Sequence, residues 1–493
     1  MEKPKTPLLF IIMSGFGVYP QQDFFRYTPN LNKFIENYPA TVVKAVDPKL
    51  GRLDSKSGHQ IMGAGRSVLP IQERISSDID EGVFFDKEQV QNITKQLKEN
   101  DSDLHLFASL LDYSDAKHIL ALAKTAPEGT DVHIHLSTNT DNLDTVQARQ
   151  RLRTINSESV DGVNVASIVN QEHIRRSQDW DRLKEVVSVF LNEEKGAPKS
   201  FDNPVKFSKK NSKFSVASIE GKNITIGPED AVVFADHNGK NMRYLAKAFS
   251  LPVFKFERKE PELDVSTLVE YEKDIPAEII YSRSIFHDNL TEVVVKDGFL
   301  PYYITESIKS PYLNYYFKGN IMDKFKDEEV ETVSSLNVQS FSERPAMASK
   351  EISRKLLEKL QQGKHDIYIA EFPNFEKMNS NKEKKKALKK LDGTIGKLVE
   401  NVMVKGGVSI ITSDYSQNLN QDQSNNNVPL LVISNELRGI SFPQAKVPNS
   451  DLTLASPSGS LKDVAPTVLK LIDVDIPEKM ETDGFNLDFN ISP

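Results

Sequence analysis

Short runs of apolar residues alternate along the chain with longer stretches in which apolar side chains recur every three or four positions. The first run, Leu8–Met13, ends at Ser14-Gly15 and is typical of a strand buried on both faces. Similar runs predict strands over residues 104–110, 133–136, 163–169, 231–235, 367–370, 408–412 and 430–434. Strands that alternate with helices favour a mainly parallel sheet, so the expected fold class is α/β.

Helical periodicity predicts the elements between these strands. Residues 115–124 and 180–191 form two predicted helices, and a third begins at Ser349, interpreted as its N-cap, and ends at Gly363. A longer helix is expected over residues 381–404, before a glycine pair. Residues 193–213, rich in lysine, serine and proline, are interpreted as a surface excursion.

Composition narrows the functional classes. A length of 493 residues is enough for two or three domains, and a net charge of −8 argues against general nucleic-acid binding. Cysteine is absent, which excludes disulfides, thiolate metal sites and cysteine nucleophiles. No apolar run is long enough for a membrane span, so we expect a cytoplasmic protein.

The segment 51–66 carries the strongest local signal, with four glycines, two serines and a histidine. We interpret it as a turn-rich loop that could present Ser55 as a nucleophile, although a purely structural glycine loop is the commoner explanation of such a pattern. His59 is expected to bond to backbone or water within this loop.

Ser55, Gly58-His59 and Gly63-Ala64-Gly65-Arg66 resemble the nucleophile segment of the cofactor-independent phosphoglycerate mutases, which belong to the alkaline phosphatase superfamily. Other pieces similar to that family follow in the same order, among them Thr28-Pro29-Asn30-Leu31, Ile304-Thr305-Glu306-Ser307, Thr412-Ser413-Asp414 and Asp463-Val464-Ala465-Pro466-Thr467. The resemblance implies an alkaline-phosphatase-like domain with a central, mainly parallel sheet, built from residues 1–72 and 285–493. Residues 73–284 would form an inserted second α/β domain.

The family uses two Mn²⁺ ions, which stabilise the serine alkoxide and balance the charge of the transferred phosphoryl group. In this chain the implied ligand positions hold different side chains: Ser14, Ser380, Tyr415 and Gln423. Carboxylates remain at Glu376 and Asp414, and no histidine occurs after His365. We therefore expect no metal cofactor, and we interpret Ser55 as a vestigial nucleophile without an adjacent base.

The substrate pocket that the resemblance implies is also reduced. Asparagine stands at the family's arginine positions, at Asn170 and at both ends of the segment Asn238-Gly239-Lys240-Asn241, and the acid-base histidine loop is shortened, with His118 nearby. Arg176 and Lys309 match phosphate-contacting positions of the family. Plain surface charges are the alternative interpretation of these two side chains.

These substitutions favour a mutase-like pseudoenzyme that acts as a structural or interaction subunit. A residual 2,3-bisphosphoglycerate-independent phosphoglycerate mutase or a phosphatase with an altered metal site is the alternative, and a metabolite-sensing module that uses Arg176 and Lys309 is a third hypothesis. A protein partner could bind a dense basic segment, although such charge runs are usually solvated faces. The lysines of this segment are Lys382, Lys384, Lys385, Lys386, Lys389 and Lys390.

Overall fold

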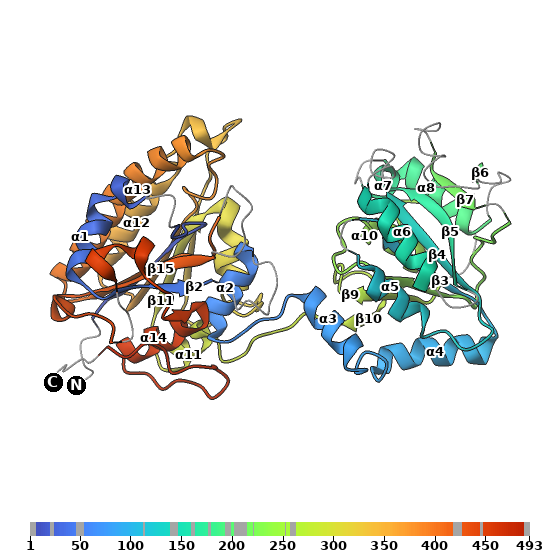
Figure 1. Cartoon of the computed structure of the whole chain (residues 1–493), viewed down its shortest axis with the longest axis horizontal. Coiled ribbons are helices and arrows are strands. Elements are labelled where there is room, and N and C mark those ends of the chain that lie inside the picture. Colours follow the sequence, from blue (N-terminus) through green and yellow to red (C-terminus); the bar gives the residue numbers. More distant parts are fainter. Residues whose placement is uncertain are drawn as a thin grey trace. The chain divides into compact units, whose positions relative to one another are not determined.

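The computed structural model describes most of the chain, in two compact units (Figure 1). Unit 1 comprises Met1–Pro70 and Ser284–Pro493, and unit 2 comprises Ile71–Arg283. The described residues are 6–19, 24–45, 54–111, 114–138, 146–158, 163–175, 179–192, 199–201, 214–219, 221–251, 253–256, 263–417, 426–443 and 447–487.

Unit 1 is built on an eight-stranded sheet in which β1 (Leu8–Met13) lies between β13 (Ile367–Phe372) and β14 (Val408–Thr412), parallel to both. β15 (Asn427–Ile433) pairs antiparallel with β14 and with β2 (Ala40–Lys44). The remaining strands of this sheet are β11 (Pro301–Glu306), β12 (Glu329–Val333) and β16 (Gly459–Ser460).

Alternate side chains of β1 enter different hydrophobic clusters, as the period of two along a strand requires. Leu9, Ile11 and Met13 pack on one face of the sheet, whereas Leu8, Phe10 and Ile12 pack on the other. This double burial explains why the strand is continuously apolar.

Helices cover both faces of this sheet (Figure 1). The first face is covered by α1 (Pro29–Asn37), α12 (Ser349–Gln362) and α13 (Asn381–Val404). The second face is covered by α2 (Ser55–Ala64), α11 (Leu290–Lys296) and α14 (Val464–Leu471).

Unit 2 contains a second eight-stranded, mostly parallel sheet with the order β10-β9-β8-β3-β4-β5-β7-β6. Its strands are β3 (Leu104–Ser109), β4 (Val132–Thr138), β5 (Val163–Asn170), β6 (Lys199–Phe201), β7 (Val216–Ile219), β8 (Ala231–Phe234), β9 (Val265–Val269) and β10 (Glu278–Tyr281). Its helices are α3 (Ile71–Asp80), α4 (Glu88–Asn100), α5 (Ala116–Ala123), α6 (Val146–Glu158), α7 (Gln171–Arg175), α8 (Trp180–Phe190) and α10 (Arg243–Ser250).

The expected α/β class is confirmed, and the strands and helices predicted from periodicity form within a few residues of their expected bounds. Ser349 is not an N-cap, because Ala348 holds that position and the Ser349 hydroxyl donates to the Ala346 carbonyl. Gly363 does end the helix, in the left-handed conformation that glycine favours. The predicted surface excursion at 193–213 lies almost entirely outside the described residues.

The prediction of a turn-rich loop over residues 51–66 is wrong for Ser55–Ala64. These residues form helix α2, which the side chain of Asp54 caps by accepting a hydrogen bond from the Ser57 amide. Gly58 serves close packing rather than a turn, since a Cβ there would lie 1.8 Å from the Asp414 carbonyl oxygen. No helix of the described chain is long and apolar enough to cross a membrane.

Candidate functional site

Three parallel strands at the centre of unit 1 end at the same edge of the sheet and deliver polar side chains there. Ser14 follows β1, Glu371 is the penultimate residue of β13, and Asp414 follows β14 by two residues. All three are completely buried. The carboxyl ends of parallel strands are where α/β folds place ligands and reacting groups.

The first two turns of α2 supply Ser55 and His59, which share one side of the helix because they are four residues apart. The tight packing of Gly58 on Asp414 lets the helix come this close. The Ser55 hydroxyl donates a hydrogen bond to Asp414 Oδ2 and accepts one from Lys309 Nζ at 2.5 Å. The backbone amide of Gly15 holds the other carboxylate oxygen of Asp414 at 2.9 Å.

Lys309 lies in a short 3-10 turn directly after β11, and its side chain is completely buried. Its ammonium group lies 2.9 Å from Glu376 Oε2, 3.4 Å from Glu371 Oε1 and 3.5 Å from Asp414 Oδ2. Burial disfavours the charge, but these three carboxylates outweigh it and raise the pKa of Lys309 above its ordinary value. Lys309 is therefore a permanent cation.

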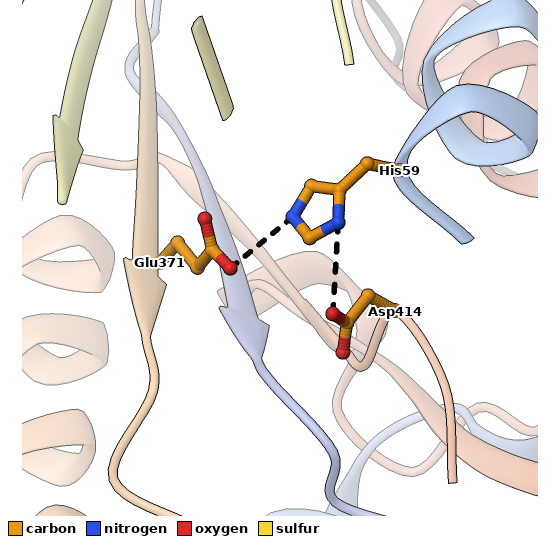
Figure 2. Close-up of side chains that lie close together, drawn as sticks. All are labelled: His59, Glu371 and Asp414. Atoms are coloured by element: carbon orange, nitrogen blue, oxygen red, sulfur yellow. Dashed lines mark ion pairs between the residues drawn. The ribbon is translucent and has the colours of Figure 1, made fainter. Parts of the chain in front are cut away.

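His59 bridges the helix and two strand ends (Figure 2). Its Nδ1 lies 2.6 Å from the Ser55 carbonyl oxygen and 3.5 Å from Asp414 Oδ2, and its Nε2 lies 3.2 Å from Glu371 Oε1. Burial opposes protonation, yet the Glu371 and Asp414 carboxylates raise the pKa of His59. With acceptors facing both ring nitrogens, the charged imidazolium fits the site best.

The pKa values of the two buried carboxylates, Glu371 and Asp414, shift in the opposite direction, to below their ordinary values. Burial alone would raise the pKa values of Glu371 and Asp414, but the nearby charges of His59 and Lys309 lower both. Glu371 also accepts a hydrogen bond from the Ser14 hydroxyl at 2.6 Å. The cluster thus combines three carboxylates, counting Glu376, with two cations around one serine hydroxyl.

Comparisons with known proteins identify the framework that carries this cluster. Residues 6–476 match the model of the metalloenzyme superfamily, which spans nearly the whole chain. The chain belongs to the metalloenzyme superfamily. The predicted resemblance to the cofactor-independent phosphoglycerate mutases and the alkaline phosphatase superfamily is confirmed.

Individual relatives agree with this assignment. The chain is 25% identical to the 2,3-bisphosphoglycerate-independent phosphoglycerate mutase of a Picosynechococcus species, over 97% of this chain and 96% of the relative. It is 26% identical to the enzyme of the same name from Staphylococcus epidermidis, over 97% of this chain and 98% of that relative. A crystal structure of Leishmania mexicana phosphoglycerate mutase covers 99% of both chains with a TM-score of 0.66 at 20% identity, and this likeness shows the shared fold.

The described residues do not fit the two-ion centre of the mutase family. Among the residues that the structure describes, only His59, Glu371 and Asp414 bring potential ligand atoms within 4.8 Å of one another, which is a donor set for a single ion. All three already form ion pairs within the protein, and the Lys309 ammonium lies against both carboxylates. A divalent ion would therefore have to compete with Lys309 for Glu371 and Asp414.

The predicted mutase ligand positions hold residues that bond to other parts of the protein. Ser380 is the N-cap of α13, in a capping box with Glu383. Tyr415 keeps its proton because burial and the charges of Glu376 and Asp414 raise its pKa. Glu376 and Asp414 both reach the cluster, through Lys309. Gln423 lies outside the described residues.

The two predicted phosphate-contacting residues have different outcomes. Arg176 lies outside the described residues. The interpretation of Lys309 as a plain surface charge is wrong, because the side chain is buried at the centre of the cluster. The statement that Ser55 has no adjacent base is also wrong, since its hydroxyl hydrogen-bonds to the Asp414 carboxylate.

The residues at the reduced substrate pocket make internal contacts in unit 2. The Asn170 side-chain amide donates to the Phe214 carbonyl, and the Asn241 amide donates to the Ser109 hydroxyl. His118 is buried, with its Nε2 2.9 Å from the Ser76 hydroxyl, and burial lowers its pKa. These side chains are engaged in holding their own unit together.

Sequence reasoning missed two members of the cluster. For His59 it gave the backbone contact but not the ion pairs with Glu371 and Asp414. Glu371 was missed completely, although one signal was available. A carboxylate inside the apolar run 367–372 must be buried with a partner of opposite charge or a strong donor.

The basic segment of α13 is less uniform than its sequence indicates. Lys382, Lys386, Lys389 and Lys390 are exposed, but Lys384 is almost completely buried. The Lys384 ammonium donates to the Gln417 carbonyl at 3.1 Å and lies 4.3 Å from the centre of the Phe375 ring. Lys384 is therefore not part of the predicted docking surface.

Proposed function

We propose that the chain is a phosphoglycerate mutase-like pseudoenzyme, derived from a glycolytic enzyme family, that serves as a structural or interaction subunit. The observation that supports this proposal is the engagement of the described ligand positions in other bonds. Ser14 donates to Glu371, Ser380 caps α13, and Tyr415 retains its phenolic proton. None of these side chains can replace a histidine or carboxylate at a bimetallic centre without losing its present partner.

Electrostatics also oppose phosphoryl transfer at Ser55. The positive charges of Lys309 and His59 are already paired with Glu371 and Asp414, and Glu376 pairs with both Lys309 and Lys377, whereas a transferred phosphoryl group needs positive charge that is free to face it. Ser55 is only 5% exposed, and its hydroxyl is held between Lys309 and Asp414. A phosphate ester that approached Ser55 would meet the buried Glu371 and Asp414 carboxylates, which already engage the Lys309 ammonium group.

A coupled assay that converts 3-phosphoglycerate to 2-phosphoglycerate, with Mn²⁺ added, tests the proposal. We expect no turnover above that of the Ser55→Ala protein purified in the same way. Turnover that requires Ser55 would overturn the pseudoenzyme assignment.

A residual mutase or a phosphatase with an altered metal site is the second candidate. The Ser55 hydroxyl favours it, because Asp414 is positioned to accept its proton and Lys309 to stabilise the resulting alkoxide. Hydrolysis of an activated aryl phosphate is the sensitive test, since its good leaving group reduces the demand on the site. Activity abolished by both Ser55→Ala and Asp414→Asn, under conditions in which both variants remain folded, would support this candidate.

For the interaction role, we propose that the exposed lysines of α13 bind an acidic protein partner. Lys382, Lys386, Lys389 and Lys390 project from one helix, and Lys385 and Lys389 also lie over the Tyr27 ring. Reversing the four exposed lysines to glutamate should weaken partner recovery in a salt-dependent way and leave the melting temperature nearly unchanged. Undiminished recovery by the reversed protein would remove this surface from the proposal.

A further inference from the structure

Lys309 occupies a position in unit 1 that resembles the centre of a metal site. Its nitrogen lies within 3.5 Å of four oxygen atoms from four separate segments of the chain. These segments are helix α2, strand β13, the turn after β13 and the loop after β14, which contribute Ser55, Glu371, Glu376 and Asp414.

The shape of this arrangement matches cation coordination. Divalent ions in proteins are surrounded by carboxylate and other oxygen ligands at about 2.0–2.6 Å. The oxygens around Lys309 Nζ lie 2.5–3.5 Å away, which is the longer reach expected when the central cation donates hydrogen bonds. The Tyr312 ring closes another side, with its centre 4.1 Å from Nζ.

Charge balance makes the lysine necessary. Without it, the Glu371 and Asp414 carboxylates would face one another with only the His59 imidazolium between them, while Glu376 would keep its ion pair with Lys377 at 3.3 Å. Like charges buried at this separation repel strongly, so the site requires a cation at its centre. Lys309 is tethered to the turn that follows β11, so this cation cannot dissociate.

We infer that Lys309 is a built-in cation that takes the place of a divalent metal ion at this site. The inference goes beyond the proposed function, because it concerns cation binding and stands whether or not Ser55 transfers phosphate. It follows that removing the ammonium group should convert the cluster into a site for a free divalent cation. His59, Glu371 and Asp414 would then be available as nitrogen and oxygen ligands of the kind that Mn²⁺ accepts.

The test compares Mn²⁺ binding by the full-length wild-type protein and Lys309→Met. Equilibrium dialysis should find no bound Mn²⁺ in the wild type and about one ion per chain in the variant, the number that a single three-ligand set accommodates. At a Mn²⁺ concentration about one hundred times the dissociation constant, the variant's melting temperature should rise by about 5 °C, and the wild type's should not change.

Lys318→Met is the matched control. Lys318 is also buried, at 3% exposure, forms an ion pair with Glu328 at 2.8 Å and lies over the Tyr303 ring. Lys318→Met leaves one carboxylate, Glu328, without its lysine, whereas Lys309→Met leaves three. Mn²⁺ should therefore neither bind to Lys318→Met nor stabilise it. A Mn²⁺ response in both variants would show nonspecific rescue of a buried carboxylate and overturn the inference.

The remaining outcomes are also decisive. Tight Mn²⁺ binding by the wild type, or a folded Lys309→Met protein without any Mn²⁺ response, overturns the inference. If Lys309→Met does not fold alone, refolding with Mn²⁺ or with a chelator replaces the melting experiment, and recovery only with Mn²⁺ supports it. Recovery under neither condition counts against it. Mutase turnover by a wild-type protein that binds no Mn²⁺ would overturn the proposed function and leave this inference standing.

Discussion

Both units bury histidines among polar side chains, but in opposite charge states. In unit 1, the Glu371 and Asp414 carboxylates overcome burial and raise the pKa of His59. In unit 2, burial is the largest influence on His105 and His135 and lowers the pKa of each, that of His135 most strongly. The imidazole is therefore favoured as a cation in the first cluster and as a neutral ring in the second.

The contacts in unit 2 explain the difference. His105 Nδ1 lies 3.0 Å from His135 Nε2, and His135 Nδ1 lies 2.8 Å from the Ser167 hydroxyl. The two rings stack at 5.2 Å on adjacent strands, and His135 also contacts the Phe107 ring. Neutral imidazoles can both donate and accept along such a row, whereas two imidazoliums would repel.

This comparison shows two ways to bury a titratable side chain. A charged group needs an opposite charge from another segment, so the cluster in unit 1 depends on residues far apart in the sequence. A neutral group needs only hydrogen-bond partners, and in unit 2 the neighbouring strands provide them together with the Asp230 carboxylate, which lies 3.3 Å from His105 Nε2. The two clusters should therefore respond differently to substitution and to pH.

The largest effect is expected from breaking the charge balance of unit 1. Asp414→Asn removes a carboxylate that faces Lys309, His59 and the Ser55 hydroxyl. Removing one partner of a buried ion pair typically costs about 3–5 kcal/mol, and we expect this loss in the free energy of unfolding of unit 1. Hydrogen exchange at the β1 amides measures it.

Unit 2 provides the internal control for Asp414→Asn. Trp180, the only tryptophan of the chain, lies in α8, so its fluorescence reports on the unfolding of unit 2. The midpoint of this fluorescence transition should not move. A loss below about 1 kcal/mol in unit 1 would contradict the view that its stability depends on charge pairing.

A smaller effect is expected from Ser55→Ala, which keeps every charge but removes the hydroxyl between Lys309 and Asp414. Hydrogen bonds to charged groups contribute about 1.5–3 kcal/mol each, and alanine leaves both partners with their other contacts, so we expect a loss of about 2 kcal/mol in unit 1. A vestigial nucleophile without these two hydrogen bonds, as Ser55 was interpreted from the sequence, would leave the stability almost unchanged. Urea unfolding with hydrogen exchange at β1 distinguishes the two outcomes.

The pH dependence of unit 2 tests its neutral cluster. His105 and His135 have pKa values below the ordinary 6.5, so the unfolded chain takes up protons first as the pH falls. Stability is therefore complete above about pH 6.5 and falls below it, by up to about 1.4 kcal/mol per pH unit for each histidine. Urea titrations followed by Trp180 fluorescence should show this slope.

His135→Phe should flatten this slope, because it removes one titrating ring and suits the aromatic contacts with Phe107 and Phe190. An acid slope that survives His135→Phe unchanged would exclude this histidine as its origin.

In unit 1 the pH dependence that His59 contributes has the opposite sign. Its raised pKa stabilises the fold below pH 6.5, and this contribution is lost as the pH rises through the folded-state value.

Much of the fold was predictable because it rests on local patterns. Buried parallel strands such as β1 are continuous apolar runs, and α13 shows apolar side chains at helical spacing. Helix α2 was not predictable in this way. Its glycines resemble loop residues, but Gly58 and Gly63 are there because the backbones of Asp414 and Phe317 pack against them, a contact between distant segments.

The candidate site was predictable only in part, for the same reason. Ser55 and Asp414 were found through local resemblance to the mutase family, and the structure brings them into hydrogen-bond contact. For Lys309, the resemblance to the family indicated only a matching position in the sequence. The burial of its side chain among three carboxylates was not predictable, because it depends on three other segments of the chain. Charge pairing between segments leaves almost no trace in local sequence.

Lys384 extends the comparison to a buried cation without a counter-ion. In the described part of the chain no carboxylate pairs with it, and burial lowers its pKa to about 8, opposite to the direction at Lys309. Folding favours the neutral amine of Lys384, so burial of the charged side chain lowers the free energy of unfolding at pH 7. This cost disappears as the pH rises from the folded-state pKa to the pKa of an unfolded lysine.

Lys384→Met keeps the apolar contact with Phe375 and removes the charge. We expect it to raise the free energy of unfolding of unit 1 at pH 7 by about 1 kcal/mol, the gain left after losing the bond to Gln417. The gain should disappear above about pH 10, where the unfolded lysine also loses its proton. Urea unfolding at both pH values measures it, with the exposed Lys386→Met as the control, and a loss of stability at pH 7 would show that the bond to Gln417 outweighs the cost of burying the charge.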